Sequence, residues 1–146
     1  MQYKYTQRKQ KMSKHQKKLQ KRNHKKGRTG LKRILNAAKY SKDGFISAWR
    51  EEEGFRQVSV LFVLSLGFGL WLGEGFCQKI LLVFSGTLCV IVELFNTAIE
   101  NAIDHTSLKP HPFAKKAKDM GSATQLLSLL FFALVWGVFV YERFAS

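Results

Sequence analysis

Two long stretches without charge constrain the fold of this 146-residue chain more than any other feature. Residues 57–73 are seventeen uncharged residues and residues 122–141 are twenty, while a third apolar run begins after Lys79. A helix needs about 20 apolar residues to cross about 30 Å of hydrocarbon. The sequence therefore predicts an all-α membrane protein with three transmembrane helices, over about residues 57–73, 79–104 and 122–141.

An amphipathic segment over about residues 31–53 precedes the first span. On a helix that advances about 100° per residue, one face collects apolar side chains: Leu31, Ile34, Leu35, Ala38, Phe45 and Trp49. This pattern is typical of a helix that lies on the membrane surface, with Gly44 as a candidate bend. Glu52 continues the apolar stripe, which would let its carboxylate reach the membrane bundle.

The first 30 residues form a basic tail in front of the membrane domain of residues 31–146. Of the 24 Lys and Arg residues, 14 lie at or before Arg33, and the first acid is Asp43. Such a composition cannot offset the entropy of folding, so the tail is predicted to be disordered. Two interpretations stay open for it, an extension that sets the topology and a segment that binds anionic lipid, and nucleic acid is the less favoured partner. Together with the basic 109–118 loop it predicts a cytoplasmic N-terminus and a C-terminus outside.

The two cysteines are expected to act as small packing residues. Cys77 and Cys89 are twelve residues apart, or about 18 Å along a helix, so they cannot pair within the chain. No Cys or His spacing indicates a zinc site.

An acidic face follows the apolar half of the second span. Glu93, Asn96 and Glu100 fall with Asp104 within an arc of about 80° of a helix. A charge at the centre of a membrane helix costs about 2.5–3.5 kcal/mol, so this face is predicted to meet protein and a compensating ion. The alternative is the solvated end of a membrane helix. Small residues continue the face backward and would let another helix approach: Ser85, Gly86 and Cys89.

The acids suggest phosphoryl transfer at the membrane surface. Magnesium is held by one or two carboxylates plus substrate phosphates, which Glu52 and Glu100 could supply with ATP. Glu93, deeper in the span, could accept the proton of a lipid hydroxyl. Neither a GxxxxGK[ST] loop nor an HRD or DFG motif is present. Two other classes stay open: a small proton-coupled transporter with an intramembrane Glu, and a non-enzymatic scaffold whose tail binds RNA or anionic lipid.

Three blocks of sequence carry a resemblance to a known family: Ala48-Trp49 with Glu52 and Phe55-Arg56-Gln57; Glu93-x-x-Asn96-Thr97-Ala98-Ile99-Glu100; and Ala117-Lys118-Asp119-Met120-Gly121-Ser122-Ala123. From about Gly30 onward the chain resembles the prokaryotic integral-membrane diacylglycerol kinases. The resemblance implies a homotrimer in the bacterial inner membrane with its C-terminus in the periplasm, which uses Mg-ATP to phosphorylate diacylglycerol to phosphatidic acid. One branch of the family phosphorylates undecaprenol instead, but the first and third blocks resemble the diacylglycerol branch more.

The resemblance also implies roles for single residues. It implies Glu93 as the proton acceptor, with Asn96 beside it in the catalytic site, and Glu52 and Glu100 as ligands of Mg²⁺. The nucleotide-binding positions are Arg33, Tyr40, Glu52, Glu100, His111, Lys118 and Asp119. The lipid-binding positions are Arg33, Trp49, Glu93, Ser122 and Trp136. Lys109-Pro110 departs from the residues usual in the family before His111.

Overall fold

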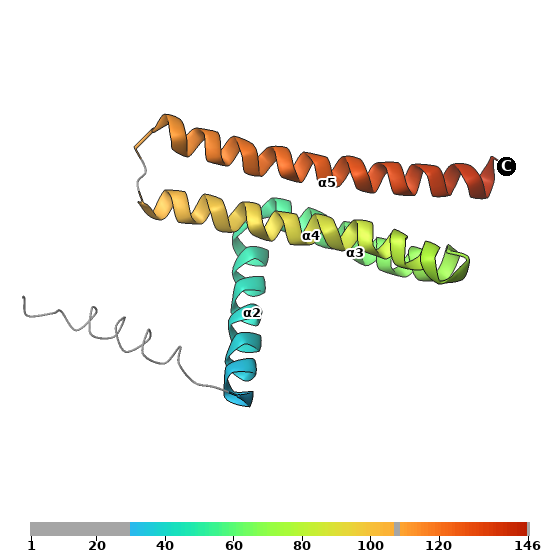
Figure 1. Cartoon of the computed structure of the whole chain (residues 1–146), viewed down its shortest axis with the longest axis horizontal. Helices are drawn as coiled ribbons and strands as arrows, with labels where there is room; N and C mark the ends of the chain where they lie inside the picture. Colours follow the sequence, from blue (N-terminus) through green and yellow to red (C-terminus); the bar gives the residue numbers. More distant parts are fainter. Residues whose placement is uncertain (1–29, 107–108, 146) are drawn as a thin grey trace, which may run out of the picture. The chain divides into compact units, whose positions relative to one another are not determined.

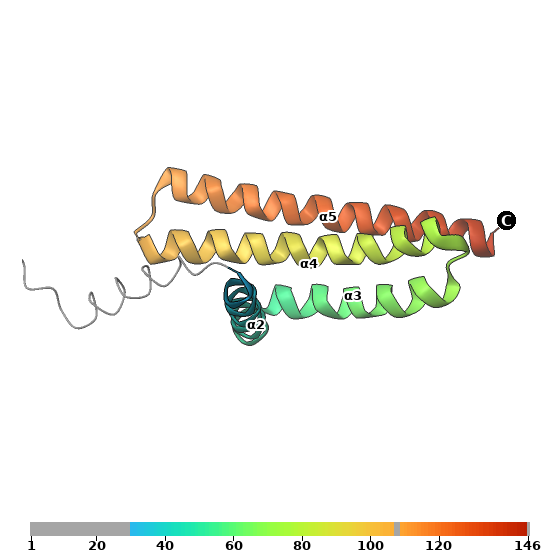
Figure 2. The same ribbon diagram turned by 60° about the horizontal axis from the view of Figure 1, so that its bottom comes forward.

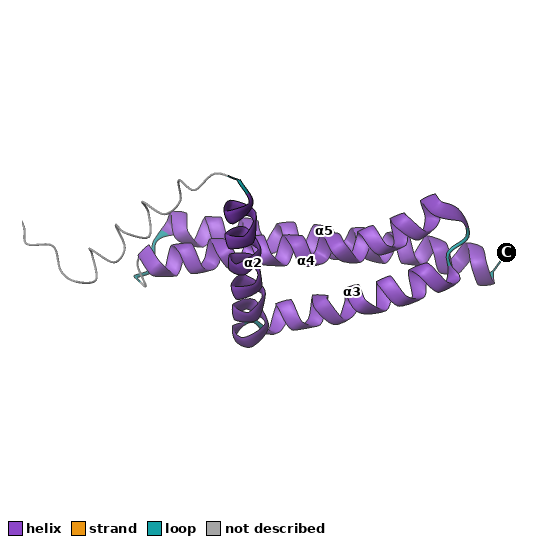
Figure 3. Cartoon of the chain, turned by 90° about the horizontal axis from the view of Figure 1, so that it is seen from below, coloured by secondary structure: helices purple, strands orange, loops and turns teal. Residues whose placement is uncertain are grey.

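The structure, a computed structural model, describes residues 30–106 and 109–145. This part of the chain is helical and contains no strand (Figures 1 and 3). It has four helices, α2 (Leu31–Glu51), α3 (Glu53–Leu72), α4 (Gly75–Thr106) and α5 (Pro112–Phe144). The last three are long and apolar enough to cross a membrane, which confirms the predicted all-α class and the three spans. The predicted basic tail lies outside the described residues, except for Gly30.

The chain divides into two compact units, residues 1–43 and residues 44–146. The described part of the first unit is the beginning of α2, where Leu31, Ile34 and Leu35 are all exposed. An exposed apolar face on a helix that also carries Lys32 and Arg33 suits the membrane surface. Helix α2 continues through Gly44, so the glycine does not break it.

A single residue separates α2 from α3. Glu52 has extended backbone angles (φ −114°, ψ 118°), and its N–H donates to Ala48 O at 2.9 Å. The predicted surface helix was extended to residue 53, but the chain turns at Glu52 and α3 begins directly with Glu53. The turn places Glu52 at the N-terminal end of the first span.

The three spans run up, down and up with short connections (Figure 2). Gly73 and Glu74 alone separate α3 from α4, and Gly75 adopts a left-handed φ of 68° that favours glycine. At the other end, α5 starts with Pro112 after His111, whose side chain accepts a hydrogen bond from Phe113 N (3.3 Å). Both long helices extend beyond the predicted spans of 79–104 and 122–141. Charged residues mark the edge of the apolar stretch, but they do not end a helix.

Helix α4 packs against both α3 and α5 through small side chains. Ser65 Oγ of α3 donates to Leu82 O of α4 (2.7 Å), and a Cβ added to Gly86 would lie 2.8 Å from Ser65 Cβ. Cys89 Sγ donates to Ser128 O of α5 (3.4 Å). The predicted close approach at Ser85, Gly86 and Cys89 is therefore confirmed, while many large apolar side chains remain on the outside, as expected of a protein in lipid.

Candidate active site

The acidic face of α4 points into the helical bundle at Glu93. This side chain is only 8% exposed, although it is a carboxylate. It has room because α3 carries a glycine at the contact: a Cβ added to Gly54 would lie 3.3 Å from Glu93 Cδ and closer still to Oε1. The buried acid therefore depends on the absence of a side chain at Gly54.

Two more carboxylates act on Glu93 from different elements. The negative charges of Glu100, on α4, and of Glu52, at the turn before α3, both repel the charge of Glu93. Three acids gathered in this way attract a cation, because each carboxylate is stabilised by a positive charge nearby. The structure thus brings together the three acids that the sequence predicted would converge.

Asn96 connects this cluster to α5. Its Nδ2 donates to Glu100 Oε1 at 3.3 Å. Its carbonyl end packs on Gly121 of α5, where an added Cβ would lie 3.3 Å from Asn96 Cγ and closer still to Oδ1. Glycines on α3 and α5 thus give space to the two central polar side chains of α4.

Lysine and aspartate side chains continue the site toward the α4–α5 connection. Lys118 Nζ of α5 lies 2.7 Å from Asp104 Oδ1 of α4, and the charge of Glu100 attracts the same ammonium group. One turn away, Lys115 Nζ pairs with Asp119 Oδ2 at 2.6 Å. Lys118 therefore stands next to the acid cluster, as expected of a group that would bind phosphate.

A cavity of about 660 Å³ opens beside these ion pairs. Its lining includes three predicted nucleotide-binding residues, His111, Lys118 and Asp119. The other lining residues are Ile103, Asp104, Lys109, Pro110, Pro112, Ala114 and Lys115. This cavity has the mixed polar and apolar walls that a nucleotide requires.

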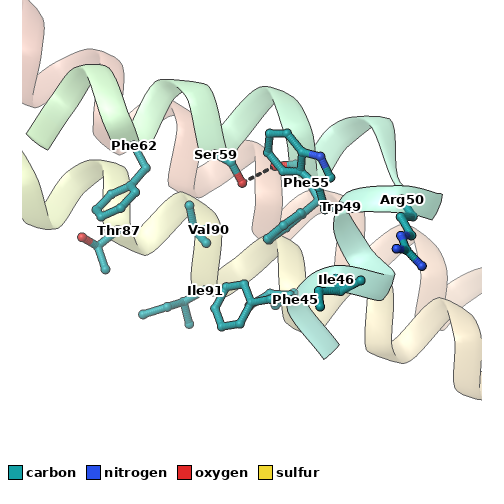
Figure 4. A pocket seen from close by; sticks show the side chains of 11 residues that line it. Phe45, Ile46, Trp49, Arg50, Phe55, Ser59, Phe62, Thr87, Val90 and Ile91 are labelled. Atoms are coloured by element: carbon teal, nitrogen blue, oxygen red, sulfur yellow. Dashed lines mark hydrogen bonds between the residues drawn. The ribbon is translucent and has the colours of Figure 1, made fainter. Parts of the chain in front are cut away.

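A second hollow, of about 670 Å³, lies where the end of α2 meets α3 and α4 and is almost entirely apolar (Figure 4). Trp49, a predicted lipid-binding residue, forms one wall. The other lining residues are Phe45, Ile46, Arg50, Phe55, Ser59, Phe62, Thr87, Val90, Ile91 and Leu94. The Ser59 hydroxyl donates a hydrogen bond to Phe55 O (2.7 Å), so the hollow offers few free polar groups. We refer to it as the apolar groove.

The remaining predicted site residues lie on α2 and α5. Arg33 and Tyr40 belong to the first compact unit, and their nucleotide contacts stay predictions. Ser122 is exposed on α5. Trp136 lies fourteen residues beyond Ser122, about 21 Å along the helix, where it packs with Phe132 and Phe139. Ser122 and Trp136 could therefore contact only different parts of a long lipid.

Magnesium fits the acid cluster better than a metal that needs a full protein cage. Among the described residues, no group of three or more His, Cys, Asp or Glu side chains could hold a metal ion by itself. Magnesium needs only one or two protein carboxylates when phosphates complete its shell. Glu52 and Glu100 meet that requirement, since Asn96 engages only one oxygen of Glu100.

Sequence reasoning missed three features of the site. It gave no role to Gly54 or Gly121, although a glycine inside a helical pattern is a signal of close approach. It also placed Asp104 on the acidic face without pairing it with Lys118. The partner lies fourteen residues away on another helix, so helical periodicity could not identify it.

A helical membrane protein with a buried glutamate, a half-buried acid beside a lysine, and an apolar groove fits the class of lipid-modifying membrane enzymes. The family model of prokaryotic diacylglycerol kinase matches residues 39–140. The chain is similar to the diacylglycerol kinases of Helicobacter pylori strain 26695 (46% identity over 108 residues, 74% of this chain and 84% of the relative) and Escherichia coli K12 (36% over 116 residues, 80% and 95%). The Pseudomonas aeruginosa diacylglycerol kinase is 45% identical over 111 residues, which cover 76% of this chain and 90% of the relative.

The chain therefore belongs to the prokaryotic diacylglycerol kinase family. It is a multi-pass membrane kinase, and membership in a kinase family implies ATP as the phosphoryl donor. This assignment favours the predicted kinase over the transporter and the scaffold.

Proposed function

We propose that the protein transfers the γ-phosphoryl group of ATP to the free hydroxyl of diacylglycerol, and that the acid cluster of Glu52, Glu93 and Glu100 catalyses this step. Glu93 accepts the hydroxyl proton while the hydroxyl oxygen bonds to the γ-phosphorus. The bond from that phosphorus to the bridging oxygen breaks, and ADP leaves with its electron pair. The products are phosphatidic acid and ADP.

The observation that carries this proposal is the burial of Glu93 beside Glu52 and Glu100. A carboxylate that is shielded from water on a membrane helix suits a base that meets a lipid hydroxyl rather than solvent. Asn96 packs on Gly121 and donates a hydrogen bond to Glu100, which orients that carboxylate. Lys118, near Glu100, offers a positive charge to the phosphates.

Glu52 and Glu100 are the proposed ligands of a magnesium ion that enters with ATP. Magnesium would neutralise charge on the phosphates as the bond to the leaving oxygen breaks. Lys118 and Asp119, which line the cavity at the α4–α5 connection together with His111, are the proposed nucleotide contacts in the described bundle. Arg33 and Tyr40 are proposed to join them from α2.

The apolar groove is the proposed site for an acyl chain of the lipid. Aromatic and aliphatic side chains line it. Two of them adjoin the proposed catalytic acids in the sequence: Leu94 follows Glu93 on α4, and Trp49 lies three residues before Glu52. A lipid chain in this groove would bring the hydroxyl end toward the acids. Ser122 and Trp136 are proposed lipid contacts on α5.

We further propose a homotrimer in the bacterial inner membrane, with the N-terminus in the cytoplasm and the C-terminus in the periplasm. The resemblance to the family supports the trimer. The excess of Lys and Arg in the tail and in the 109–118 loop supports the orientation. It would place the acid cluster and the nucleotide cavity on the side where ATP is found.

Glu93→Gln tests the central proposal. Gln keeps the shape of the side chain but cannot accept a proton at neutral pH. General-base catalysis contributes about 10²–10⁴-fold, so lipid phosphorylation should fall by about that factor while Mg-ATP still binds. The measurements are turnover, nucleotide binding and oligomer size on one preparation. Turnover close to that of the parent protein would remove Glu93 from the role of base.

A further inference from the structure

Two buried polar atoms between α4 and α5 have no hydrogen-bond partner within the described part of the chain. They are Asn96 Oδ1 and Gln125 Nε2, and a third such atom, Trp136 Nε1, lies farther along α5. A buried donor or acceptor that stays unpaired costs about 1–3 kcal/mol. Asn96 Oδ1 is an acceptor and Gln125 Nε2 a donor, so a single hydrogen bond between them would satisfy both.

The register of the two helices brings these residues to neighbouring turns. Cys89 pairs with Ser128 (3.4 Å), and Asn96 packs on Gly121. Each pair of positions is seven residues apart on its own helix, so α4 and α5 stay in step between the two contacts. Gln125 lies one turn beyond Gly121 in this interval. By this register it is within about one turn of Asn96 and near the depth of Glu93.

The second polar atom of each amide side chain, Gln125 Oε1 and Asn96 Nδ2, already makes a hydrogen bond. Ser128 Oγ donates to Gln125 Oε1 at 3.3 Å, and Asn96 Nδ2 donates to Glu100 Oε1 at 3.3 Å. An amide side chain has a donor nitrogen and an acceptor oxygen. The atoms left over are the donor of Gln125 and the acceptor of Asn96, which are complementary.

We propose that Gln125 is a positioning residue for the kinase reaction, because its Nε2 donates to Asn96 Oδ1 and thereby fixes the amide that holds Glu100. This bond requires the side-chain torsions of Gln125 to change while its Oε1 stays within reach of Ser128 Oγ. It completes a chain of hydrogen bonds from Ser128 through Gln125 and Asn96 to Glu100. The inference rests on the proposed role of Glu100 as a magnesium ligand. Outer partners of a ligating carboxylate typically change metal affinity by about 10–100-fold.

Gln125→Met tests this role, because Met has a similar length but no amide. We expect the Mg²⁺ concentration for half-maximal kinase activity to rise about tenfold, while the KM for diacylglycerol stays the same. Thr124→Val is the matched control. Thr124 is the preceding residue, is exposed, and bonds only to Met120 O of its own helix (2.9 Å), so its replacement should change neither quantity.

A double-mutant cycle with Asn96→Ala separates positioning from a general loss of stability. If Gln125 acts through Asn96, Gln125→Met should have no further effect on the Mg²⁺ requirement once Asn96 is removed. Equal effects of Gln125→Met in both backgrounds would overturn the inference. If Gln125→Met does not assemble, Gln125→Leu takes its place in the cycle.

A measurement without metal or substrate distinguishes this inference from the proposed function. The NMR signals of the Asn96 side-chain amide should shift, and their hydrogen exchange should accelerate, in Gln125→Met but not in Thr124→Val. Unchanged Asn96 signals overturn the inference, whatever the kinase activity. Shifted signals combined with a normal Mg²⁺ requirement in Glu100→Ala would leave the Gln125–Asn96 bond standing and refute the proposed role of Glu100.

Discussion

The two ends of the helical bundle carry similar ion pairs but differ in what surrounds them. At one end Lys118 of α5 pairs with Asp104 of α4, and at the other Arg143 of α5 pairs with Glu74 beside the α3–α4 turn, both at 2.7 Å. The first pair adjoins Glu100 of the acid cluster and a cavity of about 660 Å³. The second lines a cavity of about 200 Å³. We call them the acidic end and the turn end.

The comparison shows that an ion pair between helices does not by itself mark a functional site. Exposed ion pairs typically contribute about 0–1 kcal/mol, and all four of these side chains are at least one-third exposed. The acidic end differs because one carboxylate of its acid cluster, that of Glu93, is kept away from water. Glycine contacts make that burial possible, and they offer the sharpest way to test the comparison.

Among the glycine and ion-pair variants that test this comparison, the largest effect is expected from Gly54→Ala. The new Cβ would overlap Glu93 Oε1 and displace the carboxylate. A displacement of about 1 Å can reduce catalysis by about 10²-fold, so lipid phosphorylation should fall by that order. Gly67→Ala on the same helix is the control, because no described atom lies within 4 Å of its added Cβ. Similar activity in the two variants would show that Glu93 needs no fixed position.

The next effect concerns the proposed metal ligands. Glu52→Ala and Glu100→Ala should each weaken the use of Mg-ATP by at least about tenfold, since even outer partners of a ligand cost that much. Both act through one ion, so the double variant should lose far less than the product of the two single losses. Titrations of activity with Mg²⁺ provide the measurement. Losses that multiply would assign the two acids to separate sites.

A moderate effect is expected from Gly121→Ala, which should push Asn96 away from α5 and disturb its bond to Glu100. A new contact in a packed core typically costs about 1–3 kcal/mol, so both thermal stability and activity should fall. Gly137→Ala on the same helix meets no described atom within 4 Å and should leave both unchanged. Equal melting temperatures and activities for the two variants would contradict the close contact at Gly121.

Removing one ion pair at either end of the bundle should have a smaller effect than the substitutions above. The comparison predicts that the KM for ATP changes at the acidic end and not at the turn end. Asp104→Asn should raise the KM for ATP by a few fold, because Lys118 loses the carboxylate that orients its ammonium group beside the nucleotide cavity. Glu74→Gln should leave the KM for ATP unchanged. Initial rates over a range of ATP concentrations test both variants. A larger change from Glu74→Gln would reverse the assignment of the acidic end.

Deletion of residues 1–29 should have the least effect on catalysis. The tail precedes the matched region, which begins at residue 39. Turnover in detergent should persist, whereas binding to anionic vesicles should weaken by about 1 kcal/mol per basic residue near the surface. A truncated protein that inserts and assembles but cannot phosphorylate lipid would assign the tail a role in the reaction.

The sequence by itself determined the membrane helices and the acidic face of α4. Apolar stretches long enough to cross a bilayer predict helices because lipid offers the backbone no other hydrogen-bond partner. The spacing of Glu93, Asn96 and Glu100 predicts a shared face because these residues lie on one helix, whose geometry is local. The apolar runs predict the membrane spans, whereas helices α4 and α5 extend beyond them, because charge at the edge of an apolar run does not end a helix.

Only the tertiary structure decided which residues surround that face. Gly54 and Gly121 make room for Glu93 and Asn96 from two other helices, and Gln125 becomes a neighbour of Asn96 through the register of α4 against α5. Such contacts depend on how side chains distant in sequence pack together, and the periodicity of one helix carries no information about its partner. The acids of α4 could thus be predicted from one segment, whereas the space that allows Glu93 to be buried required the assembled bundle.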